Sequence, residues 1–294
     1  MSERRPIYLM PYLALTPGIL TLVGVFIGCT VFSVLLSFTS SGMLPNFNFI
    51  GLGQYEKLLS NARFQRSAMN LLIYGPAMLI VSLVLGTLLA ILIDQRIRAE
   101  SLFRSLFLYP YALSFIVTGH LWRWFFDPTF GIDSELAKLG LPTTGIGWLS
   151  DPNVVLFTLA IAAVWHSAGL VMVIVLARLR SIDGDIWKAT RVDGIPTWRV
   201  YISVILPMLT GALGTAFVLL SIGVIKVYDL VVAMTGGGPG FSSDMPAKFV
   251  IDSLFERQNV GQGSAGVVLM LLTVLIIFAP VILARSIKLR RATP

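Results

Sequence analysis

The titratable side chains that could carry out chemistry are few and widely spaced. The two histidines, His120 and His166, lie far apart, and each falls within an apolar segment. Two histidines without a cysteine pair give too few donors for a metal site, so we predict no metal and no cofactor. Acidic pairs within residues 133–135 and 183–185 stand where helices are expected to begin, which favours stabilisation of the helix dipole over acid–base catalysis.

Motifs that bind nucleotide phosphates or carry a catalytic nucleophile are also missing. No lysine follows a glycine anywhere, so the sequence contains no P-loop, and neither HExxH nor GxSxG occurs. We therefore predict that the chain is not an enzyme. Any energy for uphill work must come from a partner protein or from an ion gradient.

The elements that position these side chains are apolar, and the composition indicates an integral membrane protein. Of 294 residues, 56% are hydrophobic and 13% are charged, and the mean hydropathy is +0.83. Ordinary soluble domains contain about 25% charged residues. The one cysteine, Cys29, excludes a disulfide within the chain.

Six segments are long and apolar enough to cross a bilayer as helices, which takes roughly 20 residues each. The first is about twice as long as the apolar part of a signal peptide, so we keep it as a span. We predict an all-α membrane protein with six transmembrane helices in a single domain, residues 1–294. The predicted spans are residues 12–38, 68–93, 105–126, 154–177, 206–233 and 263–284.

Basic residues gather on one side of these spans. Six spans put both termini on one side, and the segments on that side hold fourteen of the 22 Lys and Arg residues against six acids. Positively charged loops face the cytoplasm, so both termini and residues 178–205 are predicted to be cytoplasmic. The net charge of +7 then reflects orientation and indicates no nucleic-acid partner. The fourteen residues are Arg4, Arg5, Arg96, Arg98, Arg104, Arg178, Arg180, Lys188, Arg191, Arg199, Arg285, Lys288, Arg290 and Arg291.

The cytoplasmic segment 178–205 has the pattern of a helix, a turn and a second helix. Ser181 or Asp183 can cap the first helix. Gly194 can take the left-handed conformation that ends it, and Pro196 suits the first turn of the next helix.

Two interpretations of this segment are open. A solvated helix would carry an exposed ion pair between Asp185 and Lys188, worth a few tenths of a kcal/mol. An interface helix would explain the apolar and aromatic side chains rimmed by arginine, and would couple a partner's motion to the bundle. These side chains are Ile186, Trp187, Val192, Ile195 and Trp198.

Three outer connections, residues 40–67, 127–153 and 235–262, are longer than a turn requires. Each contains a stretch that predicts a short surface helix, and the last begins with TGGGPG, a sharp turn. They either cap the outer ends of the bundle or form a docking surface for an external protein. The residues of the sharp turn proposed for docking are Gly236, Gly237, Gly238 and Pro239.

The cytoplasmic segment resembles the "EAA" loop of the permease subunits of binding-protein-dependent ABC importers. Their pattern is roughly E-A-A-x-x-D-G-A, followed by I-x-L-P. The matching residues are Lys188-Ala189-Thr190, Asp193-Gly194 and Ile205-Leu206-Pro207, with lysine in place of the glutamate and threonine in place of the second alanine. The segments DPTFGIDSELAKLGLPTTGIGWLSDP and YDLVVAMTGGGPGFSSDMPAKFVIDSLFERQNVGQGSA are similar to the carbohydrate branch, the maltose- and glycerol-3-phosphate-type permeases. The resemblance covers roughly residues 8–290.

The resemblance implies one subunit of a larger importer in a bacterial or archaeal cytoplasmic membrane. The implied partners are a second permease subunit, two cytoplasmic ATPase subunits, an extracytoplasmic solute-binding protein, the lipid bilayer and a sugar substrate. Overall likeness favours a hexose such as glucose or mannose and leaves oligosaccharides, glycerol-3-phosphate and polyols open. The residues that would meet the ATPase are Ile186, Trp187, Lys188, Ala189, Thr190, Val192, Asp193, Gly194, Ile195, Trp198 and Arg199.

Polar and aromatic residues inside the spans are the candidates for the sugar pathway. Trp165 and His166 are neighbours in the fourth span, where they either bind sugar or pack between helices. Lys226, Tyr228 and Asp229 lie near the outer end of the fifth, where Lys226 and Asp229 can instead pair with each other.

Two other classes of protein remain as alternatives. An ion-driven secondary transporter acting without an ATPase would have inverted repeats and acids near mid-membrane, and the sequence shows neither. A membrane-embedded enzyme would need the catalytic motifs that are missing.

Overall fold

The computed structural model describes residues 9–95 and 98–292, and the regular structure in that part of the chain is almost entirely helical. One isolated β-bridge joins Thr39 and Phe49. The prediction of an all-α protein is confirmed. Arg4, Arg5 and Arg96, which contributed to the charge argument, lie outside the described residues.

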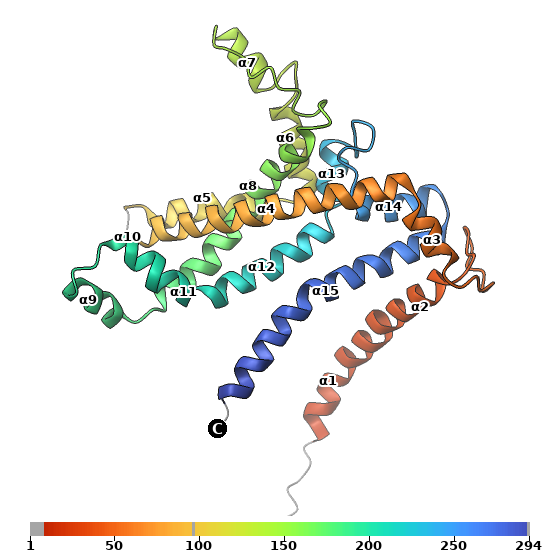
Figure 1. Ribbon diagram of the computed structural model, residues 1–294, viewed down its shortest axis with the longest axis horizontal. Coiled ribbons are helices and arrows are strands. Elements are labelled where there is room, and N and C mark those ends of the chain that lie inside the picture. The colour runs from red at the N-terminus through yellow and green to blue at the C-terminus, as the bar shows by residue number, and fades with distance from the viewer. Residues whose placement is uncertain (1–8, 96–97, 293–294) are drawn as a thin grey trace, which may run out of the picture. The chain divides into compact units, whose positions relative to one another are not determined.

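The described chain divides into two compact units, whose helices are labelled in Figure 1, and the smaller comprises residues 9–61 and 250–271. Its first helix is continuous from Leu9 to Ser37, with a π-helical stretch between two α-helical parts. The elements are α1 (Leu9–Thr21), η1 (Leu22–Ile27), α2 (Gly28–Ser37), α3 (Gly53–Leu59), η3 (Asp252–Glu256) and the first part of α15 (Val260–Ala292).

The larger unit comprises residues 62–249 together with residues from 272 onward. Long helices form its body, and short ones connect them. The elements are α4 (Ala62–Asp94), α5 (Glu100–Ala112), α6 (Phe115–Phe125), α7 (Ile132–Lys138), α8 (Val155–Arg180), α9 (Gly184–Val192), α10 (Thr197–Val200), η2 (Tyr201–Ile205), α11 (Leu206–Met208), α12 (Thr210–Ile225), α13 (Asp229–Met234) and most of α14 (Pro246–Ile251).

Helix α8 forms the core of the larger unit because small residues let its neighbours approach closely. A Cβ atom at Gly86 of α4 would overlap the side chain of Val171 in α8. On another side, a Cβ atom at Gly169 would overlap the backbone carbonyl of Phe107 in α5. Such close approach is typical of helices that associate inside a membrane, where van der Waals packing replaces the hydrophobic effect as the driving force.

Four to six helical segments in the described residues qualify as membrane spans by length and composition, and each overlaps one of the six predicted segments. Four qualify without a break: Leu15–Ser37, Ala62–Asp94, Val155–Arg180 and Val260–Ala279. Two qualify only as bent pairs: Glu100–Ala112 with Phe115–Phe125, at 101°, and Thr197–Met208 with Thr210–Ile225, at 65°.

The third predicted span, residues 105–126, is therefore not one straight helix. Helix α5 ends at Ala112, and Ser114 has an extended backbone. Its hydroxyl accepts a hydrogen bond from the backbone N–H of Val117 at 3.3 Å. A serine in this role starts a new helix, which explains why the chain turns here despite its apolar composition.

The fifth predicted span, residues 206–233, is also interrupted. The chain bends at Leu209, two residues after Pro207, whose missing N–H weakens the helix as expected. Helix α12 then ends at Ile225, and α13 begins only at Asp229. The prediction of one helix through this segment was wrong.

Candidate functional site

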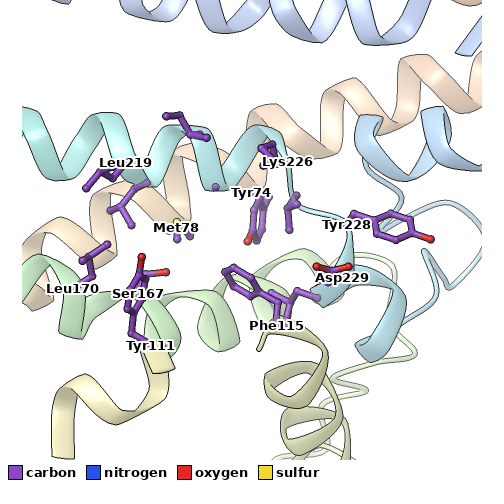
Figure 2. Close-up of a pocket in the computed structure, with 15 residues that line it drawn as sticks. Tyr74, Met78, Tyr111, Phe115, Ser167, Leu170, Leu219, Lys226, Tyr228 and Asp229 are labelled. Atoms are coloured by element: carbon purple, nitrogen blue, oxygen red, sulfur yellow. The ribbon is translucent and has the colours of Figure 1, made fainter. Parts of the chain in front are cut away.

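The interrupted helices surround a cavity of about 340 Å³ in the larger unit (Figure 2). Its walls come from α4, α5, α6, α8 and α12 and from the connection into α13. Most of the lining is aliphatic. The aromatic and polar lining residues are Tyr74, Tyr111, Phe115, Ser167, Lys226, Tyr228 and Asp229.

Helix ends meet at this cavity. The lining residues Tyr111 and Phe115 flank the break between α5 and α6, and the connection between Ile225 and Asp229 forms another part of the wall. Inside a membrane, backbone that is not helical is tolerated only where protein or a water-filled space satisfies its polar groups. Discontinuous helices therefore mark substrate and ion sites in transporters.

Three of the five predicted pathway residues, Lys226, Tyr228 and Asp229, line the cavity. Lys226 caps the C-terminus of α12, and Asp229 is the first residue of α13, so the helix dipoles favour both charges. Among the described residues, the two side chains form no ion pair or hydrogen bond with each other. The mutual pairing that the sequence allowed is absent there, and both charges can meet a polar ligand.

Aromatic rings complete the lining. Tyr74 reaches into the space from α4 and Phe115 from α6, while the ring of Tyr228 points away from it (Figure 2). The cavity thus combines flat apolar faces with hydroxyl, ammonium and carboxylate groups.

Trp165 and His166, the other two predicted pathway residues, lie outside the cavity lining. His166 is buried, and its ring contacts Tyr111 and Phe115, with centroids 5.5 and 4.1 Å apart. Trp165 packs edge-on against Trp122 at 5.8 Å. These contacts favour the alternative considered from the sequence, packing between helices, and they place His166 behind the cavity wall.

Sequence reasoning missed Tyr74, Tyr111, Phe115 and Ser167, which carry no charge and stand in strongly apolar segments. A weaker signal was present for Tyr74. It follows Asn70 by four residues, so the two share one helix face, and both are buried. A polar face on an otherwise apolar span points to the interior of the protein.

The segment 178–205 contains the predicted helix, turn and second helix. Asp183 caps α9 by accepting a hydrogen bond from the backbone N–H of Asp185 at 2.9 Å. Gly194 takes φ = +66°, the left-handed conformation, directly after the helix. Pro196 immediately precedes α10. Of the two capping residues considered, Asp183 is the one used.

One face of this segment is fastened to the rest of the larger unit. The ring of Trp187 packs edge-on against Tyr201 at 5.5 Å, and the Tyr201 hydroxyl accepts a hydrogen bond from Gln95 at 2.9 Å. Four predicted docking residues therefore contact their own chain or are buried, and they position the segment. They are Ile186, Trp187, Thr190 and Ile195.

The other face is exposed. Val192 is 86% and Trp198 62% exposed, and the Arg199 guanidinium lies over the Trp198 ring at 5.4 Å. Lys188 forms the predicted pair with Asp185 at 2.8 Å, on the surface. The predicted docking residues that remain exposed are Lys188, Ala189, Val192, Asp193, Gly194, Trp198 and Arg199.

The glycine-rich turn proposed for docking, Gly236 to Pro239, is tied to α4. Gly236 and Gly237 both have positive φ, at +63° and +93°. Asn70 of α4 donates hydrogen bonds at 2.9 Å to the backbone carbonyls of Phe241 and Asp244, just beyond the turn.

A nearly buried ion pair reinforces this attachment. The Arg63 Nε lies 2.5 Å from an oxygen of Asp244, and the two side chains are 12% and 1% exposed. The Arg63 guanidinium also lies over the rings of Phe241 and Phe249, at 5.0 and 5.7 Å. Burial keeps water from screening the pair, so its loss should be costly.

Replacing Asp244 with alanine should destabilise the larger unit by about 3–5 kcal/mol, since it breaks a nearly buried ion pair with Arg63. Thermal unfolding of the purified protein in detergent measures the effect. The matched control is Glu135→Ala, which removes an exposed pair with Lys138 (60% and 63% exposed) and should cost about 0–1 kcal/mol. Equal midpoints for the two variants would contradict a structural role for Asp244.

A family model now bears on the identity of the chain. Residues 82–291, which include the whole of segment 178–205 and most of the cavity lining, match the model described as "binding-protein-dependent transport system inner membrane component". The chain belongs to this family. Its members are transport subunits of membranes, which agrees with the prediction that the chain is not an enzyme.

The similarity to individual members of this permease family extends over nearly the full chain. It is 36% identical over 276 residues to a probable ABC transporter permease protein of Pyrococcus horikoshii, covering 92% of this chain and 94% of the relative. It is 32% identical over 270 residues to the xylose/arabinose import permease protein of Haloferax volcanii, covering 90% and 84%. The resemblance to permeases of the carbohydrate branch is confirmed.

The fold is also found in a solved structure. A bacterial ABC transporter involved in the import of the acidic polysaccharide alginate contains a chain that superimposes with a TM-score of 0.81. The match covers 97% of this chain and 96% of that chain, at 18% identity. At 18% identity, this likeness shows a shared fold only.

Proposed function

We propose that the chain is the transmembrane permease subunit of an ATP-driven sugar importer. The observation that carries this proposal is the match of residues 82–291 to the importer family, which takes in both the cavity and the segment 178–205. Several relatives named for sugar transport, such as the xylose/arabinose permease and the trehalose/maltose permease of Thermococcus litoralis, support the substrate class.

The proposed topology counts each bent pair as one span, which gives six spans in a single transmembrane domain over residues 1–294. Both termini and segment 178–205 face the cytoplasm, following the distribution of Lys and Arg. The location is the cytoplasmic membrane of a bacterium or archaeon. The glycine-rich turn, Gly236 to Pro239, then lies outside and meets the solute-binding protein.

In this proposal the cavity is part of the sugar pathway. The ring faces of Tyr111 and Phe115 can stack on the C–H surface of a pyranose. The Lys226 ammonium, the Asp229 carboxylate and the hydroxyl groups of the lining can form hydrogen bonds with the hydroxyls of the sugar. One positive and one negative charge cancel, which fits a neutral sugar. A hexose such as glucose or mannose is the specific substrate we put forward.

The exposed face of segment 178–205 is the proposed contact with the ATPase. A short helix that projects apolar groups such as Val192 and Trp198 suits a groove in a partner protein. Because the opposite face is fastened through Trp187 and Tyr201, a movement of the partner would be transmitted to the spans rather than lost in a mobile loop. A second permease subunit and two ATPase subunits complete the importer.

Reconstitution in liposomes tests the proposal. The chain, with its second permease and ATPase subunits and its binding protein, should take up labelled sugar only when ATP is present. A matched assembly whose ATPase carries an inactive P-loop should show no uptake. Uptake by the chain alone, driven by a proton or sodium gradient, would instead support the alternative of a secondary transporter. Thermal stabilisation of the associated binding protein by individual sugars identifies the substrate.

A further inference from the structure

The loop between α2 and α3 exposes four large apolar side chains. Met43, Leu44, Phe47 and Phe49 are 68%, 76%, 71% and 74% exposed, although the ring of Phe49 also stacks on Phe38 at 5.9 Å. We refer to these four residues as the apolar tip. Soluble surfaces rarely expose large apolar side chains in such close succession, so the tip indicates a contact with something outside the chain.

Charge is absent from this region. No Asp, Glu, Lys, Arg or His occurs between Arg5 and Glu56, so the loop continues the uncharged sequence of the preceding span, Leu15–Ser37. A non-obligate protein interface normally has a polar rim around its apolar core. A surface with apolar groups and no charge matches the boundary between lipid headgroups and acyl chains more closely.

The base of the loop lies level with the ends of two candidate spans in the smaller unit. The carbonyl of Ser41 accepts a hydrogen bond at 2.8 Å from the backbone N–H of Gly261, at the start of α15. Gln54 of α3 donates a hydrogen bond at 2.9 Å to the carbonyl of Thr39, just after α2. Since α2 and α15 belong to candidate spans that end here, we expect the tip to lie near the surface of the bilayer.

Two backbone hydrogen bonds close the base of the loop. Ser40 N–H donates to the carbonyl of Asn48, and Ile50 N–H donates to the carbonyl of Phe38, both at 2.9 Å. Entry into a medium poor in water is costly mainly for unpaired backbone groups. The hydrogen bonds at the base therefore lower the cost of placing the loop in lipid.

We propose that the apolar tip inserts into the interface of the phospholipid bilayer and fixes the loop between α2 and α3 at the membrane surface. This role differs from docking of an external protein, which was considered from the sequence for the connection 40–67. Insertion to a depth of about 5–10 Å, at the boundary of headgroups and acyl chains, is expected.

Site-specific labelling tests the proposal. In a Cys29→Ser background, Phe47→Cys is labelled with an environment-sensitive fluorophore, and the chain is assembled with its partner subunits in phospholipid nanodiscs. Nitroxide-labelled lipids should quench the probe, aqueous iodide should not, and its emission should shift to shorter wavelength. Phe49→Cys provides a second position should the first variant not assemble.

Phe130→Cys is the matched control. Phe130 is also an exposed phenylalanine in a loop, at 80%, but it stands beside Asp127 in a polar sequence. Its probe should be quenched by iodide and not by nitroxide lipids. Iodide quenching at position 47 without lipid quenching would overturn the proposal. So would protection at position 47 from both quenchers, whether constant or appearing only with the binding protein, because a protein would then cover the tip.

Discussion

Replacing Gly194 with proline should abolish sugar transport while leaving the chain inserted and assembled in the membrane. Gly194 has φ = +66°, and proline fixes φ at about −65°, so the turn after α9 cannot form in this variant. The exposed residues on both sides of the turn, Val192 and Trp198 among them, would lose their relative placement. Transport by the reconstituted importer should fall by at least about tenfold, equivalent to about 1.4 kcal/mol.

The change should act on coupling rather than on folding of the bundle. No heavy atom lies within 4 Å of a Cβ built at Gly194, so the substitution disturbs the backbone of the turn and little else. ATP hydrolysis stimulated by the sugar-loaded binding protein should therefore be lost together with transport. Detergent-solubilised protein should keep its elution volume and helical circular dichroism.

Two further variants show how the loss of transport depends on the conformation of the turn. Gly194→Ala can keep the turn at a cost of about 1–2 kcal/mol, so it should retain part of the activity. Gly184→Ala is the matched control, because Gly184 lies in the first turn of the same helix, without positive φ and with open space around its Cβ position. It should transport normally. Normal transport by Gly194→Pro would exclude segment 178–205 as the coupling element.

Local signals in the sequence predicted this segment well. Asp183 caps the helix and Gly194 ends it, because capping and left-handed conformations depend on a few adjacent residues. The sequence did not distinguish which apolar residues face a partner. Trp187 and Val192 looked equivalent, but Trp187 packs on Tyr201, while Val192 is 86% exposed. Only the position of the neighbouring helices determines which of these two side chains is packed and which is exposed.

The bends in the spans could not be predicted from hydropathy, which measures composition and not direction. Residues 105–126 are apolar on both sides of Ser114, so the turn of 101° leaves no trace in a hydropathy average. The serine itself was the available signal, since it caps the helix that follows. The same limitation hid the interruption between Ile225 and Asp229.

The cavity depends on contacts between distant parts of the chain. Tyr74, Tyr111 and Ser167 come from three helices, and nothing in their separate surroundings indicates that they share one space. Lys226 and Asp229 were predicted because charge inside a span is rare enough to be informative alone. Uncharged aromatic and hydroxyl groups become informative only when the packing is known.

Filling this cavity should block transport without weakening the fold. Gly223 lines the cavity on α12, and a Cβ at this position would meet no heavy atom within 4 Å. Phenylalanine at position 223 would occupy the open space. Because glycine is the weaker helix former by a few tenths of a kcal/mol, the stability of the protein should be unchanged or slightly higher. Sugar uptake should fall by at least about tenfold.

Gly214→Phe is the matched control, since Gly214 lies on the same helix with equally open surroundings but outside the cavity lining. It should transport sugar normally, and Gly223→Ala should retain most activity because it adds a single methyl group. An equal loss for both phenylalanine variants, or full uptake by Gly223→Phe, would remove the cavity from the pathway.

The two blocked importers should also differ from each other in ATP hydrolysis. A plugged pathway leaves segment 178–205 and its turn intact, so Gly223→Phe should retain ATP hydrolysis stimulated by the sugar-loaded binding protein, whereas Gly194→Pro should lose it. Hydrolysis without uptake in the first variant, and loss of both in the second, would separate the pathway from the coupling element within one chain. If Gly223→Phe also lost hydrolysis, the cavity would act in the conformational change itself rather than only as a passage for sugar.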